Sequence, residues 1–257
     1  MIEIKNLTVG FDQGTPSEKM VLKNFNITIE DGEFVVLLGS NGAGKSTLFN
    51  ALLGTVKYTG DIYLDGILLN GIPQHKRAKN IGIVFQDPLR GTAPNLSVFE
   101  NMILSTKGRV GLLGKKQYKK EAINELETYG LGLENQLDTA AKQLSGGQRQ
   151  SLTLYMATNS NPDVLLLDEH TAALDPKTQE IVMDITDRIV KEKKMTTLMI
   201  THNLKTALKY GTRLIILNEG KIVVDLKGEE KANSTEEELL KMYSKHFSDN
   251  ILFSEQN

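Results

Sequence analysis

The chain has 257 residues, of which 40% are hydrophobic and 24% are charged, as is ordinary for a soluble globular protein. It contains no cysteine, which excludes disulfides, thiol catalysis and cysteine-ligated metals, and its net charge of −2 argues against nucleic acid as a partner. No apolar run approaches the ~18 residues of a membrane span, and Met1-Ile2-Glu3-Ile4 does not resemble a signal peptide, so we expect a cytosolic protein.

The first 33 residues predict antiparallel β structure, because apolar and polar residues alternate there as in half-exposed strands. The alternating apolar positions are Ile2, Ile4, Phe25, Ile27 and Ile29. A continuous apolar run, Phe34-Val35-Val36-Leu37-Leu38, follows and predicts a strand that is buried on both faces.

The next nine residues are Gly39-Ser40-Asn41-Gly42-Ala43-Gly44-Lys45-Ser46-Thr47, which match the phosphate-binding pattern G-x-x-x-x-G-K-[ST]. Backbone amides wrap the polyphosphate in such a loop, and the helix that begins there adds its positive end. Lys45 is expected to bind the β- and γ-phosphates, and the Ser46 hydroxyl is expected to bind Mg²⁺. The alternative is a glycine-rich turn with a stray lysine.

Between this loop and residue 159 the pattern changes from strands to helices. Residues 61–70 predict a hairpin with an Asp65-Gly66 turn, and Ile81 to Phe85 predict a short strand that Gln86 follows. A capping-box spacing at Ser97 predicts a helix start. The glycine-rich, basic segment 106–116 predicts a flexible loop, and a helix follows with Ala122, Ile123, Leu126 and Tyr129 on one face and a stop at Gly130.

Strands resume at residues 164–167, and Asp175-Pro176 begins a helix whose buried stripe runs to Val190. Further elements are expected at 197–201 (strand), 204–208 (helix), 214–217 with 222–224 (hairpin) and 234–247 (helix). Strands that alternate with helices indicate a parallel α/β sheet, whose ligands sit at the carboxyl ends of the strands. Four candidate functional sites lie at the carboxyl ends of predicted strands: Gly39, Gln86, Asp168-Glu169 and His202.

Asp168 and Glu169 end a buried apolar strand, where a carboxylate needs a partner or a task. In P-loop ATPases an aspartate at this position holds Mg²⁺. Because side chains alternate along a strand, Glu169 is expected to face the attacking water as the general base. The alternative is an aspartate that caps a turn beside a surface glutamate.

Leu144-Ser145-Gly146-Gly147-Gln148 has capping-box spacing and two glycines that let a ligand approach a helix N-terminus. It therefore suggests a second anion site, which one nucleotide should not need from one chain. A helix start with a flexible entrance is the other interpretation.

These motifs, in this order, resemble the ATPase subunits of ABC transporters over residues 1 to about 225. The resemblance implies a P-loop fold with a mixed-sheet core and an N-terminal antiparallel β subdomain (1–87 and 160–225), an inserted helical subdomain (88–159) and a short C-terminal helical tail (226–257). It also implies a head-to-tail homodimer that sandwiches two ATP molecules with Mg²⁺.

The resemblance assigns roles to further residues. Ser145, Gly146, Gly147 and Gln148 would bind the ATP held by the other subunit, through its γ-phosphate. Phe11 would stack on adenine in place of the commoner Tyr, unless it is a core aromatic residue. Gln86 would contact Mg²⁺ or the lytic water, and His202 the γ-phosphate. Asp175 would lie at the dimer interface, and His170 stands where many relatives have Pro and is not expected to bind metal.

The implied function is ATP hydrolysis that drives a separate membrane permease from the inner face of the cell membrane. The string from Asp168 to Pro176 resembles a group of bacterial importers that work with an extracytoplasmic solute-binding protein, and some of that group import amino acids, aromatic ones included. An exporter ATPase remains open, as does a soluble ABC ATPase that remodels complexes or acts on ribosomes or DNA.

Overall fold

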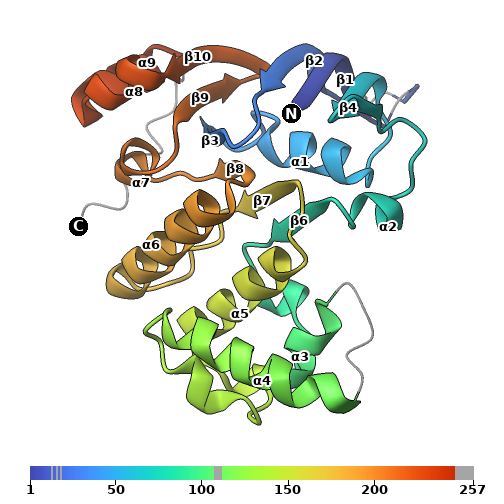
Figure 1. Cartoon of the computed structure of the whole chain (residues 1–257). Helices are drawn as coiled ribbons and strands as arrows, with labels where there is room; N and C mark the ends of the chain where they lie inside the picture. Colours follow the sequence, from blue (N-terminus) through green and yellow to red (C-terminus); the bar gives the residue numbers. More distant parts are fainter. Residues whose placement is uncertain (13, 16, 18, 107–111, 247–257) are drawn as a thin grey trace. The chain divides into compact units, whose positions relative to one another are not determined.

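The computed structural model describes residues 1–12, 14–15, 17, 19–106 and 112–246, with only the backbone at positions 112, 113 and 246. The chain forms two compact units, and each is described by itself (Figure 1). Unit 1 comprises Met1–Ile81 and Lys194–Asn257, and unit 2 comprises Gly82–Lys193.

The N-terminal part of unit 1 is an antiparallel sheet in the order β2-β1-β4-β5. Its strands are β1 (Ile2–Phe11), β2 (Lys19–Ile29), β4 (Thr59–Leu64) and β5 (Ile67–Leu68). The alternating apolar residues of β1 and β2 are buried, and Ile2 pairs with Ile29 on one side and Leu64 on the other. The expected β4–β5 hairpin forms at Asp65 and Gly66, both of which have positive φ.

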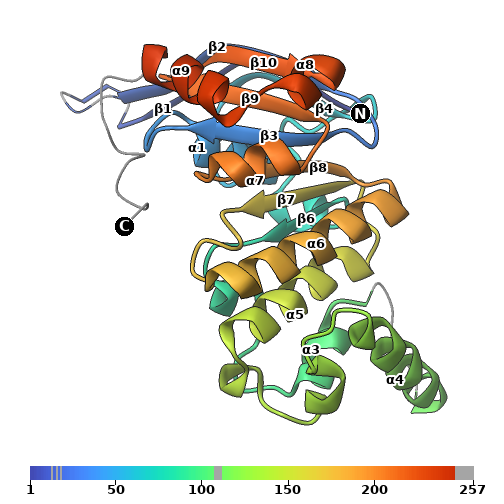
Figure 2. The ribbon, with the colours of Figure 1, turned by 90° about the vertical axis from the view of Figure 1, so that its left-hand side faces the viewer.

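The remaining strands of unit 1 are β3 (Phe34–Gly39), β8 (Thr196–Ile200), β9 (Arg213–Asn218) and β10 (Lys221–Lys227). Strand β3 pairs in parallel with both β8 and β9, whereas β10 pairs antiparallel with β9, so the sheet is mixed, as predicted. Helix α1 (Lys45–Leu53) lies on one face (Figures 1 and 2). Helices α7 (Leu204–Lys209), α8 (Gly228–Asn233) and α9 (Glu236–His246) lie on the other, and the short α2 (Gln74–Arg77) precedes the unit boundary.

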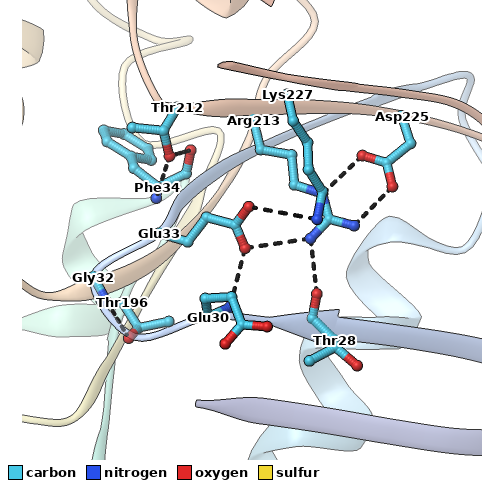
Figure 3. Close-up of polar contacts among 10 residues, drawn as sticks. All are labelled: Thr28, Glu30, Gly32, Glu33, Phe34, Thr196, Thr212, Arg213, Asp225 and Lys227. Atoms are coloured by element: carbon cyan, nitrogen blue, oxygen red, sulfur yellow. Dashed lines mark hydrogen bonds and ion pairs between the residues drawn. The ribbon is translucent and has the colours of Figure 1, made fainter.

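A buried arginine ties the two sheets of unit 1 together (Figure 3). The Arg213 guanidinium donates to both carboxylate oxygens of Asp225, at 2.7 Å each, and to the Thr28 carbonyl oxygen, also at 2.7 Å. It forms an ion pair with Glu33 as well, at 3.3 Å. Burial alone lowers the pKa of Arg213, but the two carboxylates outweigh it and raise that pKa. This network fixes the turn that leads from β2 into β3.

Unit 2 holds the neighbouring strands β7 (Val164–Asp168) and β6 (Ile81–Val84, apart from its first residue). Its helices are α3 (Val98–Leu104), α4 (Leu112–Glu127), α5 (Gly146–Asn159) and α6 (Pro176–Lys193). Three short 3₁₀ turns, η1 (Pro88–Gly91), η2 (Leu133–Gln136) and η3 (Ala141–Gln143), connect them. Helix α5 packs against α3 and α6 (Figure 2). Within the described part of the chain, no helix combines the length and apolarity that a membrane crossing requires.

Two expectations about these elements were wrong in part. The loop predicted at 106–116 is already helical from Leu112, because this stretch carries leucine, lysine and glutamine and no proline, and such residues favour a helix. Helix α8 was not predicted. Helix α9 is described up to His246, so the expected helix end at residue 247 lies outside the described residues.

Candidate functional site

The phosphate-binding loop of unit 1 joins the buried strand β3 to helix α1. Gly39, Gly42 and Gly44 have φ of 153°, 83° and 106°, a region that side chains rarely adopt. Around Gly42 no atom lies within 4 Å of the place of a Cβ, so the space beside this residue is open. Gly44 is the N-cap of α1 and supplies no capping side chain to the amides of the first turn. The loop therefore presents backbone N–H groups to a bound anion.

Lys45 and Ser46 place the two expected functional groups at the start of α1. The Lys45 side chain is buried, and its ammonium donates to the carbonyl oxygens of Gly39 and Ser40, at 2.6 and 3.0 Å. The positive charge thus lies against the loop itself, where a polyphosphate can exchange for those carbonyls. Ser46 is exposed, and its hydroxyl has the oxygen chemistry that suits Mg²⁺.

Two neighbouring segments support the loop. A Cβ on Gly44 would lie 2.7 Å from Cδ2 of Leu22 on β2, and one on Gly39 would lie 2.4 Å from the Leu217 carbonyl oxygen on β9. The Gly220 amide in the β9–β10 turn donates to the Ala43 carbonyl oxygen at 3.0 Å. Sequence reasoning identified that turn but not its support of the loop, since hydrophobic spacing does not show which turn meets which loop.

His202 follows β8, the strand that pairs in parallel with β3. Because Leu37 is in register with Ile200, the loop and His202 follow neighbouring strands at one edge of the sheet, as expected. The Thr201 amide donates to the Leu37 carbonyl oxygen at 3.3 Å, and Asn203 caps α7, which together fix the backbone around His202. Phe11 lies at the end of β1 in the other sheet and is 40% exposed, so it is not a core aromatic residue.

In unit 2, Gln86 follows β6, and Asp168 is the last residue of the neighbouring strand β7. Gln86 is exposed, and the strand end before it is held by buried Gln150, whose amide donates to the Phe85 carbonyl oxygen at 3.4 Å. Glu169 lies beyond the strand with φ of 46°. The sequence argument assumed that strand alternation sets the direction of the Glu169 side chain. That assumption was wrong, because Glu169 adopts a left-handed backbone conformation after the strand has ended.

His170 is buried and serves the fold. Its Nε2 lies 3.2 Å from Oγ1 of Thr186, which itself donates to the Val182 carbonyl oxygen at 2.7 Å. The hydroxyl proton is thus in use, so His170 is the donor and carries its proton on Nε2. Burial lowers the pKa of His170 to about 4. Among the described residues, no cluster of three or more His, Asp or Glu side chains is arranged to hold a metal.

The second glycine motif begins helix α5 with the expected capping box. The Gln148 amide donates to Ser145 Oγ at 3.3 Å, and the Ser145 amide donates to Gln148 Oε1 at 3.1 Å. A Cβ on Gly147 would lie 2.3 Å from Cγ2 of Thr178 on α6, so this glycine allows the two helices to approach closely. Gly146 and Ser145 are exposed, and Ser145 can still donate its hydroxyl proton outward.

The same region holds two residues that sequence reasoning missed. Buried Asn101 exchanges hydrogen bonds with the backbone of Ala93, at 2.7 and 3.1 Å, and Arg149 donates to three carbonyls ahead of Ser145. For Asn101 the signal in the sequence is an asparagine on the helix face that also carries apolar Val98 and Met102, whereas no pattern in the sequence marks Arg149. Asp175 caps α6, and hydrogen bonds from the Thr178 hydroxyl and amide lower the pKa of its carboxyl group.

A glycine-rich loop lies between a buried parallel strand and a helix, and the lysine ammonium contacts the carbonyl oxygens of this loop. This arrangement defines a P-loop nucleotide-binding protein. Comparison with known proteins narrows this class. The family model described as "ABC transporter" matches residues 22–172. The chain belongs to the ABC transporter family, as an ATP-binding ATPase.

Individual relatives agree with this placement. The chain is 48% identical to a tyrosine transport ATP-binding protein of Clostridioides difficile, over 95% of this chain and 98% of that one. It is 35% identical to the phosphonates import ATP-binding protein PhnC of Shouchella clausii, over 100% and 96%. A solved dimer of the ATP-binding cassette MJ0796, bound to ADP and Pi, has a TM-score of 0.75 at 32% identity and covers 88% of this chain and 98% of its own.

Proposed function

We propose that the chain is the ATPase subunit of a bacterial importer, that it works at the inner face of the membrane on a separate permease, and that its cargo is an amino acid. The observation that carries the cargo is the 48% identity, over nearly the whole of both chains, to a protein named for tyrosine transport. The phosphonate import relative supports the direction. An extracytoplasmic solute-binding protein would deliver the cargo.

In unit 1, the chain's own groups would bind the triphosphate. Loop amides from Ser40 to Thr47 surround the phosphates, the Lys45 ammonium moves from the loop carbonyls to the β- and γ-phosphates, and His202 donates to the γ-phosphate. Phe11, exposed at the end of β1, would stack on adenine.

In unit 2, Glu169 would orient the attacking water and take its proton, and Gln86 would report the nucleotide to the permease through the helical segment 88–159. Mg²⁺, when bound, neutralises phosphate charge in such sites. Ser46, Gln86 and Asp168 are its proposed ligands, and all three offer the oxygen donors that this ion prefers.

Two chains would share the work. Ser145 and the first-turn amides of α5 form an anion site that the nucleotide of the same chain does not need, so we assign it to the ATP of a second copy. The dimeric structure of MJ0796, a bacterial ABC transporter cassette, supports this assignment. A monomer should therefore bind ATP but hydrolyse it poorly.

Purification from native membranes tests the transport role. We expect the chain to be recovered with a polytopic permease, and we expect membrane vesicles that carry the complex to take up a labelled amino acid only when they enclose ATP. Recovery with ribosomes or nucleic acid and no permease would contradict the proposal. ATP-dependent expulsion of the amino acid would favour the exporter alternative.

A further inference from the structure

The chain that enters helix α5 is held by an arginine from the helix itself. Arg149 Nε donates to the Ala141 carbonyl oxygen at 3.0 Å, and its Nη2 donates to those of Lys142 and Leu144, at 2.8 and 2.9 Å. These carbonyls belong to the 3₁₀ turn η3 and to the residue directly before Ser145. One guanidinium therefore fixes the last turn before the exposed serine.

Gln148, the residue before Arg149, also holds the backbone at Ser145. The Gln148 amide group accepts from the Ser145 N–H through Oε1 and donates to the Leu131 carbonyl oxygen through Nε2, at 3.0 Å. Both ends of this amide are engaged within the chain, whereas Ser145 is exposed and keeps a hydroxyl proton to donate. The geometry thus divides the motif into a group that faces outward and groups that hold it.

The segment that Arg149 holds is itself fixed on its far side. The Ala141 amide donates to the Leu96 carbonyl oxygen at 2.9 Å, and the Lys142 amide donates to that of Pro94 at 3.0 Å. These two hydrogen bonds hold the segment in place independently of α5. Its carbonyl oxygens are therefore fixed acceptors for Arg149, which positions the start of α5 relative to them.

The residue type at position 149 supports a purpose beyond helix stability. A cation in the first turn opposes the helix dipole, so the positive charge by itself does not explain an arginine here. A planar guanidinium, however, donates in several directions at fixed angles, which a lysine ammonium on a flexible stem cannot reproduce. The three hydrogen bonds from Arg149 to carbonyl oxygens depend on this fixed geometry of the guanidinium.

We propose that Arg149 is a positioning residue for ATP hydrolysis, which holds Ser145 and the first-turn amides of α5 in the arrangement that binds the γ-phosphate of a second copy's nucleotide. The inference rests on the proposed function. Arg149 itself touches no nucleotide. It acts through Ser145, so its loss should weaken pairing of two copies and turnover while each copy still binds ATP through its own Gly39–Thr47 loop.

The test uses the full chain with Glu169→Gln, in which slow hydrolysis should preserve the ATP-bound dimer, and measures by sedimentation the protein concentration at which half is dimeric. Adding Arg149→Lys, which keeps the charge but loses the fork, should raise this concentration at least tenfold. Arg149→Gln should do the same. The matched control is Arg188→Gln, because Arg188 lies on α6, donates to Thr128 and should leave the concentration unchanged.

Three further measurements separate positioning from plain stability. ATP affinity of dilute monomer should be unchanged by Arg149→Lys, and in the otherwise unaltered chain kcat should fall at least tenfold while KM changes little. Amide hydrogen exchange should accelerate in residues 140–149 and not across the rest of unit 2. Exchange that accelerates evenly over unit 2 would overturn the inference, since Arg149 would then serve stability alone.

The outcomes also distinguish the two proposals. If the chain with Glu169→Gln alone fails to dimerise with ATP, the proposed function is wrong and this inference falls with it. If that chain dimerises and Arg149→Lys leaves its dimerisation unchanged, only the inference about Arg149 is wrong.

Discussion

Buried His170 should make the stability of unit 2 depend on pH. Its pKa is about 4 in the folded chain and about 6.5 in an unfolded one. Well above pH 6.5 the ring is neutral in both states, so His170 does not make the unfolding free energy depend on pH in that range. Between the two values the unfolded state binds the proton and the folded state does not, so stability falls as the pH falls.

The size of the effect follows from the two pKa values. At pH 5 the unfolding free energy should be about 2 kcal/mol lower than at pH 8 through His170 alone, and the full loss near pH 4 approaches about 3 kcal/mol. The assay is urea unfolding at a series of pH values, with a chelator present and no nucleotide.

The variant His170→Gln can still donate to Thr186 but does not titrate. It should be less dependent on pH than the original chain by about 2 kcal/mol between pH 8 and pH 5. His75 is exposed, so His75→Gln is the control and should leave the pH dependence as it was. Equal pH dependence in the original chain and in His170→Gln would refute the reasoning.

Three other changes give separate tests. Gly44→Ala forces a side chain into φ of 106° and against Leu22, so ATP binding should be lost in a titration, whereas Gly66→Ala, with open space around it, should bind normally. Arg213→Met removes the guanidinium from Asp225 and from partly buried Glu33, which keeps only the longer ion pair with Lys227 at 4.0 Å, and should lower the unfolding free energy in urea by about 3 kcal/mol; a loss under about 1 kcal/mol would contradict the network. Gly147→Ala should destabilise the chain by colliding with Thr178, and adding Thr178→Ser, which removes the obstructing methyl, should restore thermal stability.

Patterns local in the sequence predicted most of the fold. Buried strands such as β3 and β7 showed as unbroken apolar runs, and helix starts at Ser97, Ser145 and Asp175 showed as caps that the structure confirms. These signals depend on neighbours within a few residues, which the sequence displays directly.

Contacts between distant residues could not be predicted in this way. The hydrogen bonds from Arg213 to Thr28 and from Gln148 to Leu131 join segments whose spacing carries no periodic signal. The first residues of α4 were mistaken for part of a loop. Backbone detail was equally hidden, because the positive φ of Glu169 depends on the turn that follows β7 and not on strand alternation. The glycine loop at Gly39 was predictable because nearly every residue in it is constrained by phosphate chemistry.

The central claim is that two copies build each ATP site, one through Lys45 and the other through Ser145, and a mixing experiment tests it most directly. Lys45→Ala and Ser145→Arg chains should each be nearly inactive alone. In an equal mixture, half of the dimers would contain one intact site, so activity should recover to about a quarter of the original rate. A mixture that stays as inactive as its two components would contradict the account.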